Sequence, residues 1–226
     1  MIEVVKKGPD EKYNFEDLYD IIRKLRSPGG CPWDREQTHE TLIKPMIEEA
    51  YEAVDAIEKN SIDKMTEEMG DVLLQVIFHC IIGEETGEFD FLDVTDRCAR
   101  KMLTRHTHIF GDAVAENAEE ALVNWDAAKL KEKGFDSLRQ DLDDIPSQFP
   151  ALMRAAKCAK KIRKAERTEI DSDTGALIDS LKIDFSDEKI VGKVLYEICR
   201  RAEESGVEAE LALKNCTNDV IKSIEK

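Results

Sequence analysis

Residues 48–82 read EEAYEAVDAIEKNSIDKMTEEMGDVLLQVIFHCII, and this stretch decides the fold. Its apolar residues recur with the spacing of an α-helix on both sides of Asn60 and Ser61, a pair typical of a tight turn. Ser61 can cap the second helix, and Gly87 is expected to end it. From 72 to 82 that helix is apolar on nearly every face, which predicts burial on all sides. The stretch therefore predicts a helical hairpin with a buried second helix.

Four acidic residues have mirror-image spacing about the turn of this hairpin. Glu49 and Glu52 are three residues apart and share one helix face, and Glu68 and Asp71 share a face of the second helix. In an antiparallel hairpin Glu52 lies opposite Glu68 and Glu49 opposite Asp71, so the four carboxylates converge. Like charges that close disfavour each other unless solvent or a cation relieves them. An oxygen-only site suits a hard cation, so we expect Mg²⁺ here, with Mn²⁺ as an alternative.

The composition of the chain favours helices over strands. The chain has 226 residues, of which 42% are hydrophobic and 36% are charged, and it has six prolines. This length suits one large domain or two small ones, and the hydrophobic share is enough for a core. Few prolines together with many charged residues favour long amphipathic helices. Because no segment alternates with the period of a strand, we predict an all-α fold.

The net charge of −16 limits the expected partners of the chain. A chain this acidic repels nucleic acid and anionic membranes, so we expect neither as a partner. No apolar run approaches the roughly 20 residues that a membrane-spanning helix needs, and residues 1–8 are not an apolar signal core. Six cysteines without a Cys-x-x-Cys pair indicate reduced thiols, which predicts a cytoplasmic location.

Capping residues and helix breakers set the expected ends of the other helices. Asn14 can cap a first helix, with Asp17 at the capping-box position. Asp34 can cap the helix that follows the loop at 30–34, and Asn117 can cap one that ends near Gly134. Further helices are expected at 62–85, 151–166, 189–205 and 208–226, with loops at 107–116 and 168–173. We therefore expect a helical catalytic domain at 1–134, a linker at 135–150 and a second helical region at 151–226.

The acidic pattern closely resembles that of the MazG family of nucleoside triphosphate pyrophosphohydrolases. The family signature is EExxE followed, after a spacer, by ExxD, and here it stands at residues 48–52 and 68–71. Four further segments resemble the family: GCPWD at 30–34, RHTHIF at 105–110, LDDIP at 142–146 and PALMRA at 150–155. Together these similarities cover most of residues 15–160.

The resemblance implies a fold, an activity and an assembly. The implied fold is an all-α helical bundle of the MazG type that forms a homodimer. The implied activity is Mg²⁺-dependent hydrolysis of a nucleoside triphosphate to a nucleoside monophosphate and pyrophosphate, with a metal-bound water attacking the α-phosphorus.

The resemblance also assigns roles to individual residues. The metal ligands of the family match Glu49, Glu52, Glu68 and Asp71, and Glu48 stands beside them as a further catalytic candidate. The phosphate-binding pair matches Lys101 and Arg105, and a further nucleotide-contacting pair matches Trp125 and Lys129. Each pair is four residues apart and shares a helix face. Cations can hold a triphosphate, and an indole can stack on many bases, so these roles are chemically reasonable.

The C-terminal part resembles a second copy of the family domain that has lost its acids. Gly192 stands where Gly70 stands in the first copy, but Ile190 and Lys193 occupy the two acidic positions. Residues 206–213 also resemble the second half of longer family members. Because a lysine cannot ligate Mg²⁺, we predict a single active site, in the N-terminal half, and a packing or dimerisation role for the C-terminal half.

Other interpretations of the same residues remain open. The acids could form two solvated helix faces without a metal. A di-iron bundle would need Glu-x-x-His twice, and only residues 36–39 offer that motif. We expect His106 and His108 to have a structural role in a loop and not to bind a metal. A non-catalytic module that binds a nucleotide or a protein partner is the main alternative, although the four acids together with Lys101 and Arg105 argue against it.

Overall fold

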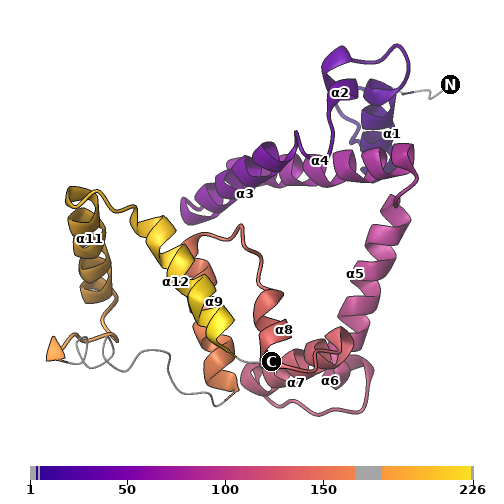
Figure 1. Ribbon diagram of the computed structural model, residues 1–226. Helices are drawn as coiled ribbons and strands as arrows, with labels where there is room; N and C mark the ends of the chain where they lie inside the picture. Colours follow the sequence, from indigo (N-terminus) through magenta and orange to yellow (C-terminus); the bar gives the residue numbers. More distant parts are fainter. Residues whose placement is uncertain (1–3, 5, 166–179, 225–226) are drawn as a thin grey trace. The chain divides into compact units, whose positions relative to one another are not determined.

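The computed structural model describes residues 4, 6–165 and 180–224, and every regular element among them is a helix (Figure 1). The helices are α1 (Phe15–Arg26), α2 (Pro32–Glu36), α3 (Ile43–Glu58), α4 (Ile62–Thr86), α5 (Phe91–Arg105), α6 (Thr107–Phe110), α7 (Ala118–Lys133), α8 (Leu138–Asp143), α9 (Ala151–Lys164), α11 (Glu188–Glu204) and α12 (Ala209–Ser223). The all-α prediction is confirmed for these residues. None of these helices is both long enough and apolar enough to cross a membrane. Two compact units divide between Asn124 and Trp125, and each has a hydrophobic core of its own.

The predicted hairpin is formed by α3 and α4, and a Schellman motif makes its turn. Asn60 adopts a left-handed conformation with a φ of 51°, which asparagine tolerates better than most residues other than glycine. The N–H of Asn60 donates to the carbonyl of Ile57 at 3.0 Å, and the N–H of Ser61 donates to that of Ala56 at 3.1 Å. Because α4 begins directly after Ser61, this turn sets the register of the two helices.

Small side chains let α3 lie close to α4. Ala53 and Ala56 are the buried residues of α3, and α4 is the one helix in the described ranges against which α3 packs. Figure 1 shows α3 beside the N-terminal half of α4. Since alanine has no side chain beyond Cβ, the two backbones can approach closely along this seam.

The C-terminal half of α4 forms the centre of the first unit's core. Ile77, Phe78 and Ile81 are buried there and pack with Tyr19 of α1 and Leu42. The prediction of burial on all sides from 72 to 82 is wrong near its start, because the side chain of Leu73 is 37% exposed. Within the first unit α1 packs against α4 and contributes to this core, whereas α3 lies along the N-terminal half. One side of that half therefore stays exposed within a single chain.

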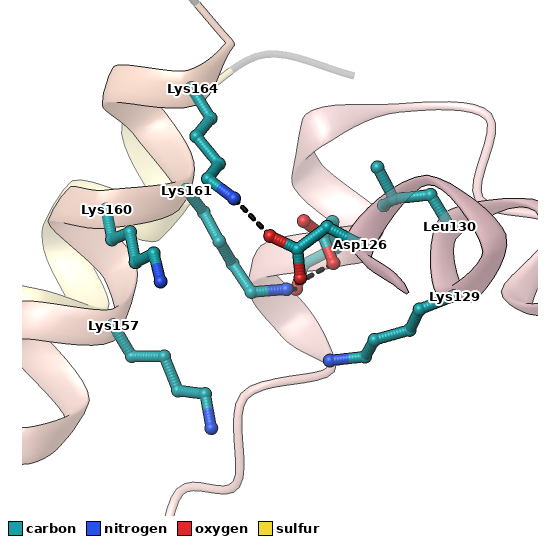
Figure 2. Close-up of a pocket in the computed structure, with 8 residues that line it drawn as sticks. Asp126, Lys129, Leu130, Lys157, Lys160, Lys161 and Lys164 are labelled. Atoms are coloured by element: carbon teal, nitrogen blue, oxygen red, sulfur yellow. Dashed lines mark hydrogen bonds and ion pairs between the residues drawn. The ribbon is translucent and has the colours of Figure 1, made fainter. Parts of the chain in front are cut away.

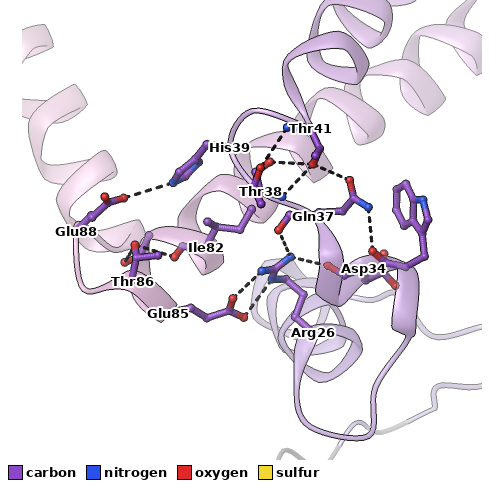
Figure 3. A network of polar contacts seen from close by, with 12 residues as sticks. Arg26, Asp34, Gln37, Thr38, His39, Thr41, Ile82, Glu85, Thr86 and Glu88 are labelled. Carbon is purple, nitrogen blue, oxygen red and sulfur yellow. Dashed lines mark hydrogen bonds and ion pairs between the residues drawn. The ribbon is translucent and has the colours of Figure 1, made fainter.

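A buried arginine ties the segment between α1 and α3 to the end of α4 (Figure 3). The guanidinium of Arg26 donates to the backbone carbonyls of Asp34 and Gln37 at 2.5 and 3.0 Å. It also donates to both carboxylate oxygens of Glu85, at 3.1 and 2.6 Å. A planar guanidinium suits this forked arrangement. Residue Arg26 therefore fixes α2 and the residues after it against the core.

The start of α2 differs from the prediction. The helix begins at Pro32 with Cys31 at the N-cap position, so Asp34 lies inside the helix and does not cap it. The fixed φ of proline suits the first position of a helix, where a missing N–H costs nothing. The proline, rather than the carboxylate two residues later, therefore sets the start.

The predicted caps of two longer helices are confirmed. Asn14 and Asp17 form a reciprocal capping box at the start of α1. The N–H of Glu120 donates to the side chain of Asn117 at 2.9 Å, directly before α7. The loop expected at 107–116 is interrupted by the single turn of α6.

The second unit packs α8, α9 and α12 around a small core. Leu142 and Ile145 are buried there with Cys158 of α9 and Ile221 of α12. Residues 135–150, expected to be a linker, thus supply a helix and two core side chains, and the two units divide inside α7 rather than at residue 134. Because aspartates and prolines surround Leu142 in the sequence, the composition of this segment predicts a linker and not a buried side chain. The polar loop expected at 168–173 lies outside the described residues.

Candidate active site

Three carboxylates meet where α3 and α4 run side by side. Glu49 of α3 and Glu68 and Asp71 of α4 each offer one carboxylate oxygen, and these three atoms all lie within 4.8 Å of one another. The side chain of Glu68 is buried, and those of Glu49 and Asp71 are half-buried. The turn at Asn60 sets the register, and the spacing of three residues puts both acids of α4 on one face. The structure thus brings three of the four predicted ligands together.

The two other acids of α3 lie outside this group of three. Glu52 is exposed, but it is near enough to raise the pKa of Glu68, next in effect to the burial of that carboxyl. Glu48 is exposed and its carboxylate pairs with the ammonium of Lys44 at 3.2 Å. The register therefore brings Glu52 close to the group as expected, whereas Glu48 faces a lysine of its own helix.

Burial and like charge act together on the clustered acids. Burial raises the pKa of Glu49, and Asp71 and Glu52 raise it further. The pKa of Glu68 is raised in the same way, although the ammonium of Lys64, at 3.9 Å, acts in the opposite direction. The ionised acids are therefore held at a cost in free energy, which a bound proton or cation relieves. The sequence analysis did not identify Lys64 as a neighbour of the acidic group. Its spacing of four residues from Glu68 places the two side chains on the same helix face and could have indicated the contact.

The carboxylate group fits a hard divalent cation. Oxygen ligands lie about 2.1 Å from Mg²⁺ and about 2.4 Å from Ca²⁺, so two ligands on opposite sides of an ion are roughly 4.2 or 4.8 Å apart. Oxygens no more than 4.8 Å apart therefore lie near the spacing of ligands that share one ion, and any pair wider than about 4.2 Å would have to close for Mg²⁺. Glu49, Glu68 and Asp71 would hold it, and Glu52 offers another oxygen one turn along α3.

Neither histidine motif belongs to such a group. Across the described ranges, no second set of three acidic, histidine or cysteine residues has this geometry, so residues 36–39 and the pair His106 and His108 are not part of one. The Nδ1 atom of His106 instead lies 2.7 Å from the carbonyl of Met102, at the C-terminal end of α5. His106 thus makes a hydrogen-bonding contact of the kind expected, and its structural role stays a prediction.

The predicted nucleotide-binding residues lie on other helices. Lys101 and Arg105 are on α5, which Figure 1 shows leaving the C-terminal end of α4. Asp71 lies roughly 20 Å from that end, at about 1.5 Å per residue. Arg105 is buried and Lys101 is half-buried. Within a single chain, the acids therefore lie together, but Lys101 and Arg105 do not lie beside them.

The second predicted pair belongs to the other unit. Trp125 and Lys129 lie on the C-terminal half of α7, and both are half-buried. Their spacing of four residues puts them on one face of that helix, as expected from the sequence. Both residues form part of the second unit.

Comparisons with known proteins point to one family. A family model described as "MazG nucleotide pyrophosphohydrolase domain" matches residues 37–110, a range that includes the three clustered acids. A nucleoside triphosphate pyrophosphohydrolase of Escherichia coli K12 is 36% identical over 218 residues, which span 88% of this chain and 81% of that protein. The nucleoside triphosphate pyrophosphohydrolase/pyrophosphatase MazG of Thermotoga maritima is 34% identical over 223 residues, 94% of this chain and 84% of that protein.

Two further similarities cover less. The Bacillus subtilis protein YabN is 45% identical over 148 residues, and the match spans 66% of this chain but only 30% of YabN. A solved structure of a mazG-related protein from Thermotoga maritima is 28% identical and matches with a TM-score of 0.43, over 50% of this chain and 97% of that one.

The sequence matches and the site agree on the same two helices. The match to the Escherichia coli protein covers most of both chains, and the family model spans α3 and α4 in full. The acids that converge on these helices are those of the EExxE and ExxD signature. This chain belongs to the MazG family of nucleotide pyrophosphohydrolases.

Proposed function

We propose that the protein hydrolyses nucleoside triphosphates to nucleoside monophosphates and pyrophosphate, with Mg²⁺ held by Glu49, Glu52, Glu68 and Asp71. The names of the relatives from Escherichia coli and Thermotoga maritima support this activity. The observation that carries the proposal is the convergence of three carboxylate oxygens within 4.8 Å on two neighbouring helices. The repulsion between these carboxylates destabilises the folded chain, and a bound cation would offset it.

The residues of the site have distinct roles in this reaction. The acids of α3 and α4 hold the metal and orient the attacking water toward the α-phosphorus. When bound, Mg²⁺ neutralises the phosphate oxygens and makes the water more acidic. One of the carboxylates of the site takes the proton of the attacking water.

Cations and an aromatic ring complete the proposed substrate site. Lys101 and Arg105 bind the phosphates, and Trp125 and Lys129 contact the rest of the nucleotide. These roles rest on the family resemblance and on the helix-face spacing of each pair. The chain's net charge of −16 supports a small substrate over nucleic acid, and its free cysteines support a cytoplasmic location.

The second unit is proposed to lack a catalytic centre of its own. Ile190 and Lys193 lie on α11 at the positions where the first copy carries acids. Neither side chain can ligate a hard cation as a carboxylate does. Residues 151–226 therefore serve packing or dimerisation, as a degenerate copy of the catalytic domain.

A homodimer would cover the apolar face that α3 leaves exposed. The exposed apolar side chains of α3 are Ile43, Met46, Ile47, Tyr51, Val54 and Ile57. Contiguous apolar surface of this kind marks a protein interface more often than free surface. Pairing of this face with a second copy is consistent with the bundle that the family resemblance implies.

A product assay tests the proposed activity. Wild type is incubated with a panel of nucleoside triphosphates, with and without Mg²⁺, and nucleoside monophosphate and pyrophosphate are identified. We expect both products only with the metal, and a loss of at least about 100-fold in Glu68→Gln, because a metal ligand is removed. Glu58→Gln changes an exposed acid of α3 and should retain full activity. Release of neither product from any nucleotide would favour a non-catalytic binding module instead.

A further inference from the structure

The second unit contains a pocket whose lining is dominated by lysines (Figure 2). It has a volume of about 130 Å³ and lies between α7 and α9. Its lining consists of Asp126, Lys129, Leu130, Asp141, Lys157, Lys160, Lys161 and Lys164. Five lysines against two aspartates leave a formal charge of +3 in a chain whose net charge is −16. This local positive charge is unusual in a chain that is acidic overall.

The lysines are gathered by the helical repeat of α9. Lys157, Lys160, Lys161 and Lys164 are spaced i, i+3, i+4 and i+7, so they share one face of that helix. Like charges on one helix face are mutually unfavourable. The arrangement therefore lowers the stability of α9 unless an anion compensates for it.

The two aspartates compensate for only part of this charge. Lys164 pairs with Asp126 and Lys161 with Asp141, and Lys161 also donates to the backbone carbonyl of Asp141 at 2.9 Å. The ammonium of Lys157 lies over the ring of Phe149, 4.9 Å from its centre, which positions the side chain without neutralising it. The charges of Lys157 and Lys160 therefore remain at the pocket beyond these two ion pairs.

The ammonium groups face a common space. Figure 2 shows Lys160 from α9 and Lys129 from α7 extending toward the space between the two helices, with Lys157 at its rim. An anion placed there would be within reach of cations from two helices. Lysine ammoniums act as point charges without a fixed fork, so they suit the rotating oxygens of a phosphate group.

The size of the pocket limits the ligand. Sites for drug-sized molecules occupy roughly 300–1,000 Å³, and a water molecule takes about 30 Å³ of liquid. A pocket of about 130 Å³ thus has room for phosphate groups but not for a base and a sugar as well. A ligand with more than one charge is favoured, because the excess positive charge exceeds one.

We propose that this pocket binds a pyrophosphate group, either as inorganic pyrophosphate or as the phosphate tail of a nucleotide whose base stays outside. The proposal is carried by the pocket and by Lys157 and Lys160 of α9, and it depends neither on catalysis at the acids of α3 and α4 nor on the role proposed for Lys129. It gives the degenerate second unit a ligand-binding role in addition to packing.

Calorimetric titration of the full chain with inorganic pyrophosphate tests the proposal. EDTA is present throughout, so that no divalent ion can bring the anion to the acidic site. We expect saturable binding to wild type, and a Kd weakened about tenfold or more in Lys157→Gln/Lys160→Gln, because two cationic contacts are lost. Lys189→Gln/Lys193→Gln, on exposed positions of α11, changes the net charge equally and should leave the Kd within about twofold.

Several outcomes separate the alternatives. Competition by a non-hydrolysable nucleoside triphosphate would identify a nucleotide tail as a ligand, and its absence would identify inorganic pyrophosphate. Glu68→Gln should bind pyrophosphate as wild type does. Binding at this pocket can therefore be tested even if the proposed hydrolysis proves wrong. Equal Kd values for wild type and the Lys157/Lys160 variant, or equal affinity for sulfate, would overturn the proposal. Tighter binding of an oligonucleotide than of pyrophosphate would overturn it in favour of a nucleic-acid surface.

Discussion

Among single residues, Arg26 joins more parts of the first unit than its place at the end of α1 suggests. Its guanidinium binds two backbone carbonyls and one carboxylate, while the side chain is 5% exposed. Arg23, on the same helix, makes a comparable pair with Glu84 at 2.7 Å but is much more exposed. The two arginines therefore allow the effect of burial to be separated from that of charge.

Replacement of Arg26 should destabilise the protein far more than replacement of Arg23. Arg26→Ala leaves the carbonyls of Asp34 and Gln37 without a donor, which is expected to cost about 3 kcal/mol. Arg23→Ala removes a partly exposed pair and should cost less than about 1 kcal/mol. Urea denaturation of both variants measures the difference. Equal losses would show that the buried carbonyls do not depend on Arg26.

The metal site can be tested at Glu68 without any turnover. Saturating Mg²⁺ should stabilise the folded state by about 2.7 kcal/mol at 100 times its Kd, which raises the melting temperature by several degrees. Without metal, Glu68→Gln should melt no lower than wild type, because one of the converging charges is gone. Its melting temperature should not respond to Mg²⁺. Thermal melts with Mg²⁺ and with EDTA make the comparison, and an unchanged Mg²⁺ response in this variant would remove Glu68 from the site.

Within α4, two glycines offer a matched test of packing. A Cβ on Gly83 would lie 2.6 Å from the carbonyl oxygen of Phe89, a backbone atom that cannot move aside, whereas a Cβ on Gly70 would meet nothing within 4 Å. Gly83→Ala should therefore destabilise the protein by about 2 kcal/mol or more. Gly70→Ala should stabilise it by about 0.5–1 kcal/mol, since alanine favours a helix. Melting temperatures measured at a fixed low protein concentration compare the two, and a loss of stability in Gly70→Ala would indicate a neighbour that is absent from the single chain.

A histidine pair links α4 to the segment before α3. Nδ1 of His39 lies 2.7 Å from Nδ1 of His79, so one ring donates and the other accepts, and the rings stack. Burial, and then the nearby His39, lower the pKa of His79. A histidine with a lowered pKa in the folded state favours its neutral form. Its contribution to stability is therefore complete above the ordinary pKa of about 6.5 and is lost as the pH falls below it.

This pair predicts a measurable dependence of stability on pH. Between about pH 7.5 and 5.5 wild type should lose stability, with a slope from this one group of at most about 1.4 kcal/mol per pH unit. His79→Asn removes the titrating ring and should flatten the curve. Urea midpoints across this range test it, and curves of equal slope for both proteins would contradict the assignment.

Much of the element pattern could be predicted from local signals, and its failures have physical causes. The hairpin could be predicted because Asn60 and Ser61 interrupt two periodic segments and because the acids are equally spaced from them. The start of α2 could not, because Pro32 and Asp34 are both good helix-start residues and local sequence does not rank them. The exposure of Leu73 depends on which elements cover α4, and the burial of Leu142 depends on α9 and α12, so neither is readable from neighbours in the sequence.

For the whole molecule, the proposed homodimer is the main open prediction. Val54→Lys puts a charge into the exposed apolar face of α3 and should shift the protein to monomer, because an interface must desolvate that charge. Glu58→Lys adds charge at an exposed polar position of the same helix and should leave the dimer intact. Light scattering coupled to size exclusion gives the masses. A wild-type protein that is monomeric at all concentrations would contradict the homodimer.

Assembly also decides where the phosphate-binding cations come from. Because α5 leaves the far end of α4, we expect Lys101 to reach the acids of a second copy in place of those of its own chain. Mixing two inactive variants, Lys101→Ala and Glu68→Gln, should then restore up to about a quarter of the activity, through mixed dimers that contain one intact site. A mixture that stays inactive would place both residues in the site of one chain.

The turn at Asn60 has a consequence for which insertions and deletions this surface loop can accept. Loops at the protein surface usually tolerate extra residues at little cost. Here one added residue would rotate α4 by about 100° against α3 and carry Glu68 and Asp71 away from Glu49, while each helix could still form. Natural variation in the length of this loop should therefore be restricted to changes that restore the angular phase of the two helices, a constraint imposed by chemistry several turns away.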